Sequence, residues 1–262
     1  MKELKELIRV IKEKESLAVA FSGGIDSSLV AKVAWDVLGE KAVAVTFDSE
    51  VFPRKDLIFS KKVAREIGIK HIILKHSKLD DEAFVTNSKE RCYYCKAGEI
   101  DLIEEIARDN GMKTIAYGVN VSDKNEHRPG IKALREKNVF FPLEEANIGK
   151  PIIPELAKLL GLSNHNMPST TCLASRIPYG HSLNLKKLNQ IEAAENFLLK
   201  LELDDSRVRY HGGLARIEVA ENEFAKISGH KQAIVEKFKE LGFSYITLDL
   251  QGYRSGSMDE VL

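Results

Sequence analysis

Short apolar runs recur at regular intervals over the first half of the chain. They are rich in β-branched residues and cover residues 17–21, 42–47, 69–74 and 114–117. Continuous apolar runs of this length are typical of parallel strands that are buried on both faces. The pattern therefore predicts four strands at the centre of a sheet.

Amphipathic segments separate these runs and predict helices. Residues 28–38, 55–67 and 99–110 carry apolar side chains at three- and four-residue spacing. Gly39 and Gly68 directly follow the first two segments and are expected to end those helices. Strand and helix in alternation, joined by right-handed crossovers, build a doubly wound parallel sheet. We therefore predict an α/β fold for residues 1–179.

The pattern changes over the last third of the chain. We predict a smaller α+β domain over residues 180–262, which would bind substrate or support oligomerisation. Its predicted elements are a helix at 186–199, strands at 207–210 and 215–219, a helix at 223–241 and a strand at 244–248.

The overall charge argues against some partners. The chain has 39 basic and 39 acidic side chains, so it lacks the positive excess that attracts nucleic acid. No apolar run approaches the ~18 residues that a membrane span requires. The amino terminus alternates charged and apolar residues and lacks the apolar core of a signal peptide. We therefore expect a cytoplasmic protein with no nucleic-acid or membrane partner.

A glycine pair lies between the first predicted strand and the helix after it. At such a junction, backbone N–H groups and the helix dipole attract an anion, and glycines allow its close approach. An ordinary glycine-rich turn is the alternative, but three hydroxyls and one carboxylate in the same segment favour a phosphate site. The motif G-x-x-x-x-G-K-[ST] is absent, which argues against a kinase or motor. The candidate phosphate-binding residues are Ser22, Gly23, Gly24, Asp26, Ser27 and Ser28.

The chain has three cysteines, and two of them form a C-x-x-C motif. Cys92 and Cys95 would share one face of a helix start, and the neighbouring Arg91 and Lys96 would favour thiolates. Each cysteine alone is more often a buried apolar residue. Together with Cys172, however, they suit a 4Fe-4S cluster with one iron left open. A zinc site completed by a histidine is the alternative.

The glycine pair also carries a resemblance to a known superfamily. The sequence S-G-G-x-D-S after an opening strand resembles the PP-loop of the ATP pyrophosphatases. This resemblance implies that ATP is cleaved between its α- and β-phosphates, which gives an adenylylated substrate and pyrophosphate. It also implies an adenosine site at residues 46–49, which include Asp48.

A second resemblance covers the chain from the phosphate loop almost to its last residue. The segment C-L-A-S-R-I-P-Y-G, starting at Cys172, closely resembles the region of the LarE family that carries its sulfur-donating cysteine. Further segments that agree with this family are 118–123, 128–130, 208–212, 215–219 and 252–258. Several separated motifs in the same order are far more specific than the phosphate loop alone.

The LarE resemblance implies an ATP-dependent sulfur transferase in nickel-pincer nucleotide cofactor biosynthesis. Such an enzyme adenylates a carboxylate of pyridinium-3,5-biscarboxylic acid mononucleotide and converts it to a thiocarboxylate. One branch of the family sacrifices the sulfur of its own cysteine. The other holds a 4Fe-4S cluster with three cysteines and transfers a sulfide from the open iron. This chain has Cys92 and Cys95 in addition to Cys172, and in this it resembles the second branch. The resemblance implies that all three cysteines are catalytic cluster ligands.

The resemblance also suggests roles for charged residues and for partners. Asp26 and Asp123 are expected to help bind Mg²⁺. Arginines suit the phosphate and second carboxylate of the substrate, and Arg176 is the strongest candidate because it lies inside the Cys172 motif. The weaker candidates are Arg207, Arg209 and Arg216. The expected partners are the small pyridinium mononucleotide, further copies of the chain in a homo-oligomer and an upstream source of sulfide.

Other classes of protein share parts of this pattern. A tRNA thiolase of the same superfamily would combine a PP-loop with iron–sulfur chemistry, but it would carry a basic docking surface or zinc ribbons. An adenylating amidase would need the PP-loop and not the cysteines. A nucleotide-binding module without catalysis is the third alternative, and pyrophosphate release would distinguish an enzyme from it.

Overall fold

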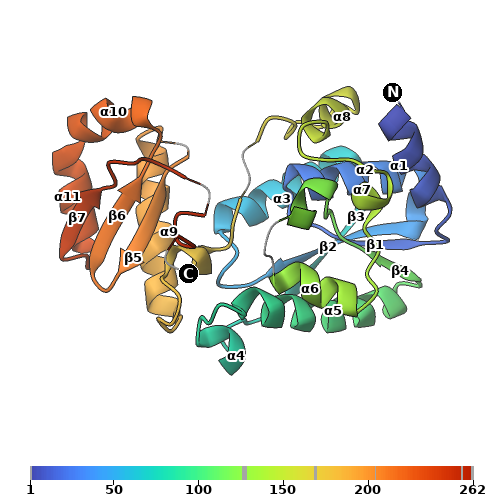
Figure 1. The fold of residues 1–262 in the computed structure, drawn as a ribbon, viewed down its shortest axis with the longest axis horizontal. Coiled ribbons are helices and arrows are strands. Elements are labelled where there is room, and N and C mark those ends of the chain that lie inside the picture. Colours follow the sequence, from blue (N-terminus) through green and yellow to red (C-terminus); the bar gives the residue numbers. More distant parts are fainter. Residues whose placement is uncertain (1, 126–128, 168–169, 204, 255, 261–262) are drawn as a thin grey trace. The chain divides into compact units, whose positions relative to one another are not determined.

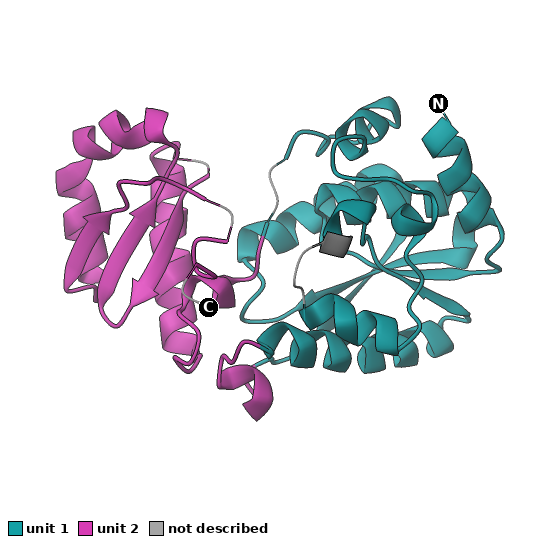
Figure 2. Cartoon of the chain, viewed as in Figure 1, with its two compact units in different colours: residues 1–78, 90–170 teal, residues 79–89, 171–262 magenta. Residues whose placement is uncertain are grey.

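The computed structural model describes residues 2–125, 129–167, 170–203, 205–254 and 256–260. These residues form two compact units, which are coloured separately in Figure 2. Unit 1 contains residues 1–78 and 90–170, and unit 2 contains residues 79–89 and 171–262. Each unit is described below by itself.

Unit 1 is built around a parallel sheet of four strands in the order β3-β2-β1-β4. In β1, Leu17 lies opposite Ala42 of β2 and Thr114 of β4. The predicted doubly wound parallel sheet is thereby confirmed, and each strand lies within about one residue of its predicted range. The strands are β1 (Leu17–Ala20), β2 (Ala42–Asp48), β3 (Lys70–Lys75) and β4 (Thr114–Ala116).

Helices cover both faces of this sheet (Figure 1). One face carries α1 (Lys2–Lys12), α2 (Ile25–Leu38), α3 (Arg54–Ile67), α7 (Pro142–Glu145) and α8 (Ile153–Leu159). The other face carries α5 (Arg91–Asp109) and α6 (Pro129–Glu136). No helix in the described ranges is both long and apolar enough to cross a membrane.

Glycines end two of these helices as the sequence predicts. Helix α2 stops before Gly39, and α3 stops before Gly68, which adopts the left-handed conformation at φ 86°. Helix α5 differs from the prediction, because it begins at Arg91 and not near residue 99. Its extra turns contain the C-x-x-C motif, whose polar neighbours weaken the helical pattern of apolar residues.

The strand order places a topological switch at β1. The chain passes from β1 outward to β2 and β3, and then returns to place β4 on the other side of β1. In open α/β sheets, ligands bind at such a switch, beside the carboxyl ends of the strands. The loops that follow β1 and β4 meet at this point.

Unit 2 contains a sheet of three strands in the order β5-β6-β7. Strands β5 (Arg207–His211) and β6 (Leu214–Glu218) are antiparallel, and β7 (Tyr245–Leu248) runs parallel to β6. Its core includes Leu198 of helix α9 (Leu185–Lys200). The predicted α+β pattern of elements is thus present in unit 2.

One predicted helix in unit 2 is wrong as a single element. Residues 223–241 form two helices, α10 (Phe224–Gly229) and α11 (Lys231–Glu240). The break falls at His230, whose backbone has φ −100° and ψ 11°. Gly229 directly precedes the break, and glycine is a poor helix former, which a reading of apolar spacing alone does not register.

The two units do not meet at the single predicted domain boundary after residue 179. Residues 171–179 and the segment 79–89, which contains α4 (Glu82–Val85), cluster with unit 2. The physical link is Asn87, which is fully buried. Its Nδ2 donates to the carbonyls of Ile177, Pro178 and His181 at 3.2, 2.9 and 3.1 Å. Contacts between segments so distant in sequence leave no local pattern.

Candidate functional site

The loop after β1 brings serine side chains to the start of helix α2. Gly24 is the N-cap of this helix, and its N–H donates to Ser22 Oγ at 3.2 Å. Ser27 Oγ donates to Gly24 O at 3.0 Å and lies 3.2 Å from Ser22 Oγ. The loop therefore presents hydroxyls and backbone N–H groups at a helix N-terminus, which is a favourable place for an anion.

Close packing fixes this loop from two sides. Gly23 has φ +77°, and a Cβ at this position would lie 2.8 Å from the Cα of Ser60 in α3. Gly118, in the loop after β4, approaches from the other side, because its Cβ would lie 2.9 Å from Ser27 N. A larger residue at either glycine would displace the start of α2.

Asp26 of the loop and the neighbouring Asp123 share Asn120 as a partner. Asn120 Nδ2 donates to Asp26 Oδ1 at 3.0 Å, and Asn120 N donates to Asp123 Oδ2 at 3.1 Å. Burial raises the pKa of Asp26; the Asn120 hydrogen bond opposes this shift, and the charge of Asp123 adds to it. Lys150 Nζ lies 3.6 Å from Asp123 Oδ1. Hard oxygen ligands in this arrangement suit a divalent cation such as Mg²⁺.

Asn164 is a part of the loop's surroundings that the sequence analysis missed. This residue follows α8 and is fully buried. Its Nδ2 donates to Gly23 O and to Ser28 Oγ, both at 2.8 Å. No motif marks Asn164 or Lys150 in the sequence, because each reaches the loop from a distant segment without regular periodicity.

The predicted adenosine-binding segment lies at the carboxyl end of β2. Asp48 accepts a hydrogen bond from Arg54 at the start of α3, and Arg54 also donates to Ser49 O at 2.6 Å. Thr46 Oγ1 donates to Phe21 O, which precedes the phosphate loop, and lies 2.8 Å from His71 Nε2. The segment is thus at the same edge of the sheet as the loop, while a contact of Asp48 with adenosine stays a prediction.

The C-x-x-C motif lies in the first turns of α5, where its spacing places both thiols on one face. Cys95 Sγ donates to Glu99 Oε1 at 3.4 Å, and Arg91 Nη2 lies 3.8 Å from Cys92 Sγ. Since α5 follows β3, its start lies near the carboxyl edge of the sheet. Lys96 supports this placement, because its Nζ lies 5.4 Å from the ring centre of Tyr117, just after β4.

Two ammonium groups surround the carboxylate that faces Cys95. Lys96 Nζ donates to Glu99 Oε2 at 2.6 Å, and the buried Lys78 Nζ lies 3.5 Å from Glu99 Oε1. Burial alone would raise the pKa of Glu99, but the charges of Lys96 and Lys78 outweigh it and lower the pKa. Glu99 therefore links the Cys95 thiol to both lysines.

Cys172 lies in unit 2, directly before the short 3₁₀ helix Leu173–Arg176. Arg176 is only 2% exposed, so it is not a solvated surface residue. Its Nε and Nη2 donate to the two carboxylate oxygens of Glu195 at 2.9 and 3.2 Å. Its Nη1 donates to Thr171 O at 3.0 Å and Cys172 O at 3.2 Å. These contacts hold the backbone of the cysteine; binding of substrate by Arg176 stays a prediction.

The weaker arginine candidates also have partners inside unit 2. Glu218 is fully buried and accepts from Arg209 at 2.7 Å, from Arg216 at 3.0 Å and from Ser257 at 2.7 Å. Arg209 Nη1 donates in addition to Ser175 O at 3.3 Å. Strands β5 and β6 are therefore tied to the Cys172 segment.

The cysteines are divided between the two units. Each of the three carries a half-buried thiol; Cys92 and Cys95 belong to unit 1 and Cys172 to unit 2. Within the ranges that the structure describes, no group of three or more histidine, cysteine, aspartate or glutamate side chains is arranged to hold a metal ion. A shared ligand set of the three cysteines therefore stays a prediction.

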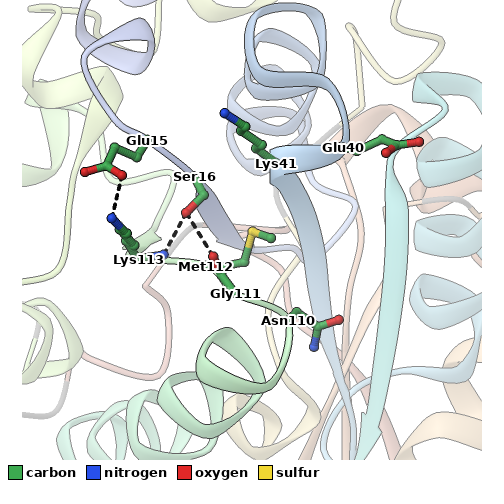
Figure 3. Close-up of a pocket in the computed structure, with 8 residues that line it drawn as sticks. All are labelled: Glu15, Ser16, Glu40, Lys41, Asn110, Gly111, Met112 and Lys113. Carbon is green, nitrogen blue, oxygen red and sulfur yellow. Dashed lines mark hydrogen bonds and ion pairs between the residues drawn. The ribbon is translucent and has the colours of Figure 1, made fainter.

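A surface pocket of unit 1 lies away from these groups. It has a volume of about 380 Å³ and is bordered by Ser16 and Lys113, among others (Figure 3). Ser16 Oγ accepts from Lys113 N at 2.8 Å and donates to Gly111 O at 3.3 Å. Ser16 precedes β1, whereas the phosphate loop follows it, so the pocket lies at the opposite edge of the sheet and is not the candidate site.

The sheet and the loop at its switch point define an α/β protein of the ATP-using PP-loop class. A family model described as asparagine synthase matches residues 8–90, which contain the loop. The pyridinium-3,5-bisthiocarboxylic acid mononucleotide synthase of Lactiplantibacillus plantarum is 36% identical, over 98% of this chain and 93% of that protein.

Two further relatives match over almost their full length. An uncharacterised protein of Synechocystis sp. is 36% identical over 99% of this chain and 98% of its own. An uncharacterised protein of Methanocaldococcus jannaschii is 32% identical over 96% and 98%. The chain belongs to the LarE family of ATP-dependent sulfur-transferring enzymes. The resemblance in the sequence motifs is thereby confirmed, although Arg128 and Ser255 of those motifs lie outside the described residues.

Proposed function

We propose that this enzyme adenylates a carboxylate of pyridinium-3,5-biscarboxylic acid mononucleotide and converts it to a thiocarboxylate, in nickel-pincer nucleotide cofactor biosynthesis. The observation that carries the proposal is 36% identity, over nearly the whole chain, to a synthase of the bisthiocarboxylic acid mononucleotide. The prepared anion site at the start of α2 supports it, because adenylation requires bound ATP.

In the first half-reaction, the serine hydroxyls and N–H groups of the loop bind the β- and γ-phosphates of ATP. Asp26 and Asp123 would hold Mg²⁺, and their shared partner Asn120 fixes the spacing of the two carboxylates. A carboxylate of the substrate attacks the α-phosphorus, and pyrophosphate leaves. Asp48 lies at the end of β2, where the adenosine would bind.

In the second half-reaction, a C–S bond forms at the acyl carbon and the bond to the AMP oxygen breaks, so AMP leaves. Cys92, Cys95 and Cys172 would hold a 4Fe-4S cluster, and the Arg91 guanidinium beside Cys92 suits a thiolate ligand there. Such a cluster would supply a sulfide at its open iron. Arg176 donates to the backbone carbonyl of Cys172 and so holds the backbone at this cysteine.

The proposal includes partners and a location. The small pyridinium mononucleotide would bind with its phosphate and second carboxylate near the arginines of unit 2. We expect a homo-oligomer that works in the cytoplasm, where reducing conditions keep thiols available. Because each turnover consumes one sulfur, an upstream source of sulfide is required.

The adenylation step is tested with anaerobically purified protein, ATP, Mg²⁺ and the pyridinium biscarboxylic acid mononucleotide. The expected result is release of pyrophosphate that depends on the mononucleotide, together with a product whose mass shows exchange of oxygen for sulfur. Nicotinamide mononucleotide, which lacks the free carboxylates, serves as the control. Equal pyrophosphate release with and without the biscarboxylic substrate would contradict the proposal.

The sulfur source is tested by replacing each cysteine with alanine. Each single variant is expected to lose most of its iron while it keeps substrate-dependent adenylation. Measurement of the iron content distinguishes loss of a cluster ligand from other causes of lost activity. A sacrificial Cys172 would instead lose about 34 Da in its peptide after turnover, because cysteine becomes dehydroalanine. Iron-free protein that shows this mass loss would exclude the cluster and leave sulfur transfer intact.

A further inference from the structure

The phosphate loop contains a peptide unit between two adjacent glycines, Gly23 and Gly24. In a trans peptide the C=O and the N–H point in opposite directions. Glycine has few steric limits, so a Gly–Gly peptide can adopt either of two orientations. Only one of them turns the N–H, and not the carbonyl oxygen, toward an anion at the start of α2.

Asn164 contacts the carbonyl end of this peptide. The Gly23 oxygen can only accept a hydrogen bond, so the atom that faces it at 2.8 Å is the amide nitrogen of Asn164. The second N–H of the same amide donates to Ser28 Oγ at 2.8 Å. Both hydrogens are thus used, and the contact lies in a fully buried environment.

The other end of the peptide, the Gly24 N–H, faces the side chain of Ser22. Gly24 N donates to the hydroxyl of Ser22, which is an exposed residue. The carbonyl oxygen therefore points into unit 1, and the N–H points to the open side of the helix N-terminus. This is the orientation that a phosphate requires, since a carbonyl oxygen in its place would repel the anion.

We propose that Asn164 is a positioning residue for ATP, which selects the orientation of the Gly23–Gly24 peptide that presents its N–H to the phosphates. The proposal rests on the assignment of ATP to the phosphate loop. Asn164 acts through the loop backbone and does not touch the nucleotide. It links the segment after α8 to the reaction site across a long stretch of sequence.

The side chain of Asn164 offers a way to separate this role from simple support of the fold. Among the described residues, its Oδ1 is a buried atom with no hydrogen-bond partner, so the contact depends on the donors alone. An aspartate has the same shape but only accepts hydrogen bonds when ionised. It would repel Gly23 O and favour the reversed peptide, in which Gly24 N–H turns inward.

The test compares Asn164→Asp and Asn164→Ala with the parent full-length protein. Isothermal titration calorimetry measures the Kd for a non-hydrolysable ATP analogue, and scanning calorimetry measures Tm. We expect the parent to bind most tightly, the alanine variant less tightly, and the aspartate variant weaker than the parent by roughly 10-fold or more. Asn87→Ala is the matched control, because Asn87 is also a buried amide that donates to carbonyls, but in unit 2.

The control is expected to lower Tm without a change in the Kd for the analogue. Loss of affinity that simply follows Tm across all the variants, or an aspartate variant that binds like the parent, would overturn the proposal. If the aspartate variant does not fold, the alanine variant and the Asn87 control still decide between the two roles. Absence of binding by the parent would reject the nucleotide site itself, and this inference with it.

Discussion

The phosphate loop of unit 1 and the Cys172 segment of unit 2 both contain buried charge, but they stabilise it in opposite ways. At the loop, Asp26 and Asp123 share the neutral Asn120 as a partner, and Lys150 Nζ lies 3.6 Å from Asp123 Oδ1. In the Cys172 segment, the guanidinium of Arg176 pairs with both oxygens of Glu195.

The pKa shifts express the same difference. Burial raises the pKa of Asp26, and the hydrogen bond from Asn120 does not cancel the shift. Burial would also raise the pKa of Glu195, but the charge and hydrogen bonds of Arg176 lower it instead. A charge that the protein leaves only partly compensated fits the proposed role of Asp26 in holding Mg²⁺. A charge that is compensated internally serves to hold a loop in place.

The largest effect is expected from disruption of the phosphate loop. Asp26→Ala removes a carboxylate that is proposed to hold Mg²⁺, and Gly24→Val blocks the approach of phosphate to the backbone, so each should lower the rate of pyrophosphate release by roughly 10²- to 10³-fold. Asp36→Ala is the control, because this acid lies in the same helix and its side chain is exposed. A variant that releases pyrophosphate at the parent rate would show that the loop is not the nucleotide site.

The next largest effect is a loss of stability when the buried ion pair between Arg176 and Glu195 is broken. Arg176→Ala leaves Glu195 buried without its ion-pair partner, which should lower the free energy of unfolding by about 3–5 kcal/mol. Urea unfolding measures this change. Lys237→Ala, which removes an exposed ion pair with Glu240, should change stability by about 0–1 kcal/mol. Similar losses in both variants would mean that the buried pair does not hold the segment.

A smaller effect, this time a gain in stability, is expected when the charge of Asp26 is removed. The folded pKa of Asp26 is raised, so the folded state loses stability relative to the unfolded state as the pH rises above 3.8 and the group ionises. Asp26→Asn keeps the acceptor for Asn120 and removes the charge. It should therefore raise Tm at neutral pH while it abolishes pyrophosphate release. An unchanged or lower Tm would show that burial of the Asp26 charge does not cost stability. Asp36→Asn provides the control.

The smallest effect is expected for His71. Its ring lies 2.8 Å from Thr46 Oγ1, which donates to the residue before the phosphate loop. Burial, together with the charge of Lys61, lowers the pKa of His71 from 6.5 to about 4. The unfolded chain thus takes up a proton before the folded one, and stability should fall as the pH decreases from 6.5 to about 4. Unfolding of His71→Gln across this range should show a shallower pH dependence. An unchanged slope would mean that His71 is accessible to protonation in the folded protein.

The sequence by itself determined the main elements of the fold and part of the site. Apolar runs locate the strands because a parallel sheet buries both faces. The S-G-G-x-D-S segment locates the phosphate loop because its glycines, hydroxyls and carboxylate lie in one short stretch. The spacing of Cys92 and Cys95 likewise predicts their common face on α5. These signals are local, so they can be detected without knowledge of the fold.

Only the tertiary structure decided which distant groups surround those motifs. Asn164 and Asn120 reach the phosphate loop from segments that are remote in sequence, and a single hydrogen bond from a loop residue leaves no periodic signal. The sequence suggests Arg176 as a substrate-binding residue, which stays a prediction, whereas its pairing with Glu195 depends on how α9 packs. Charge compensation depends on distance and burial, and both arise when separate segments fold together.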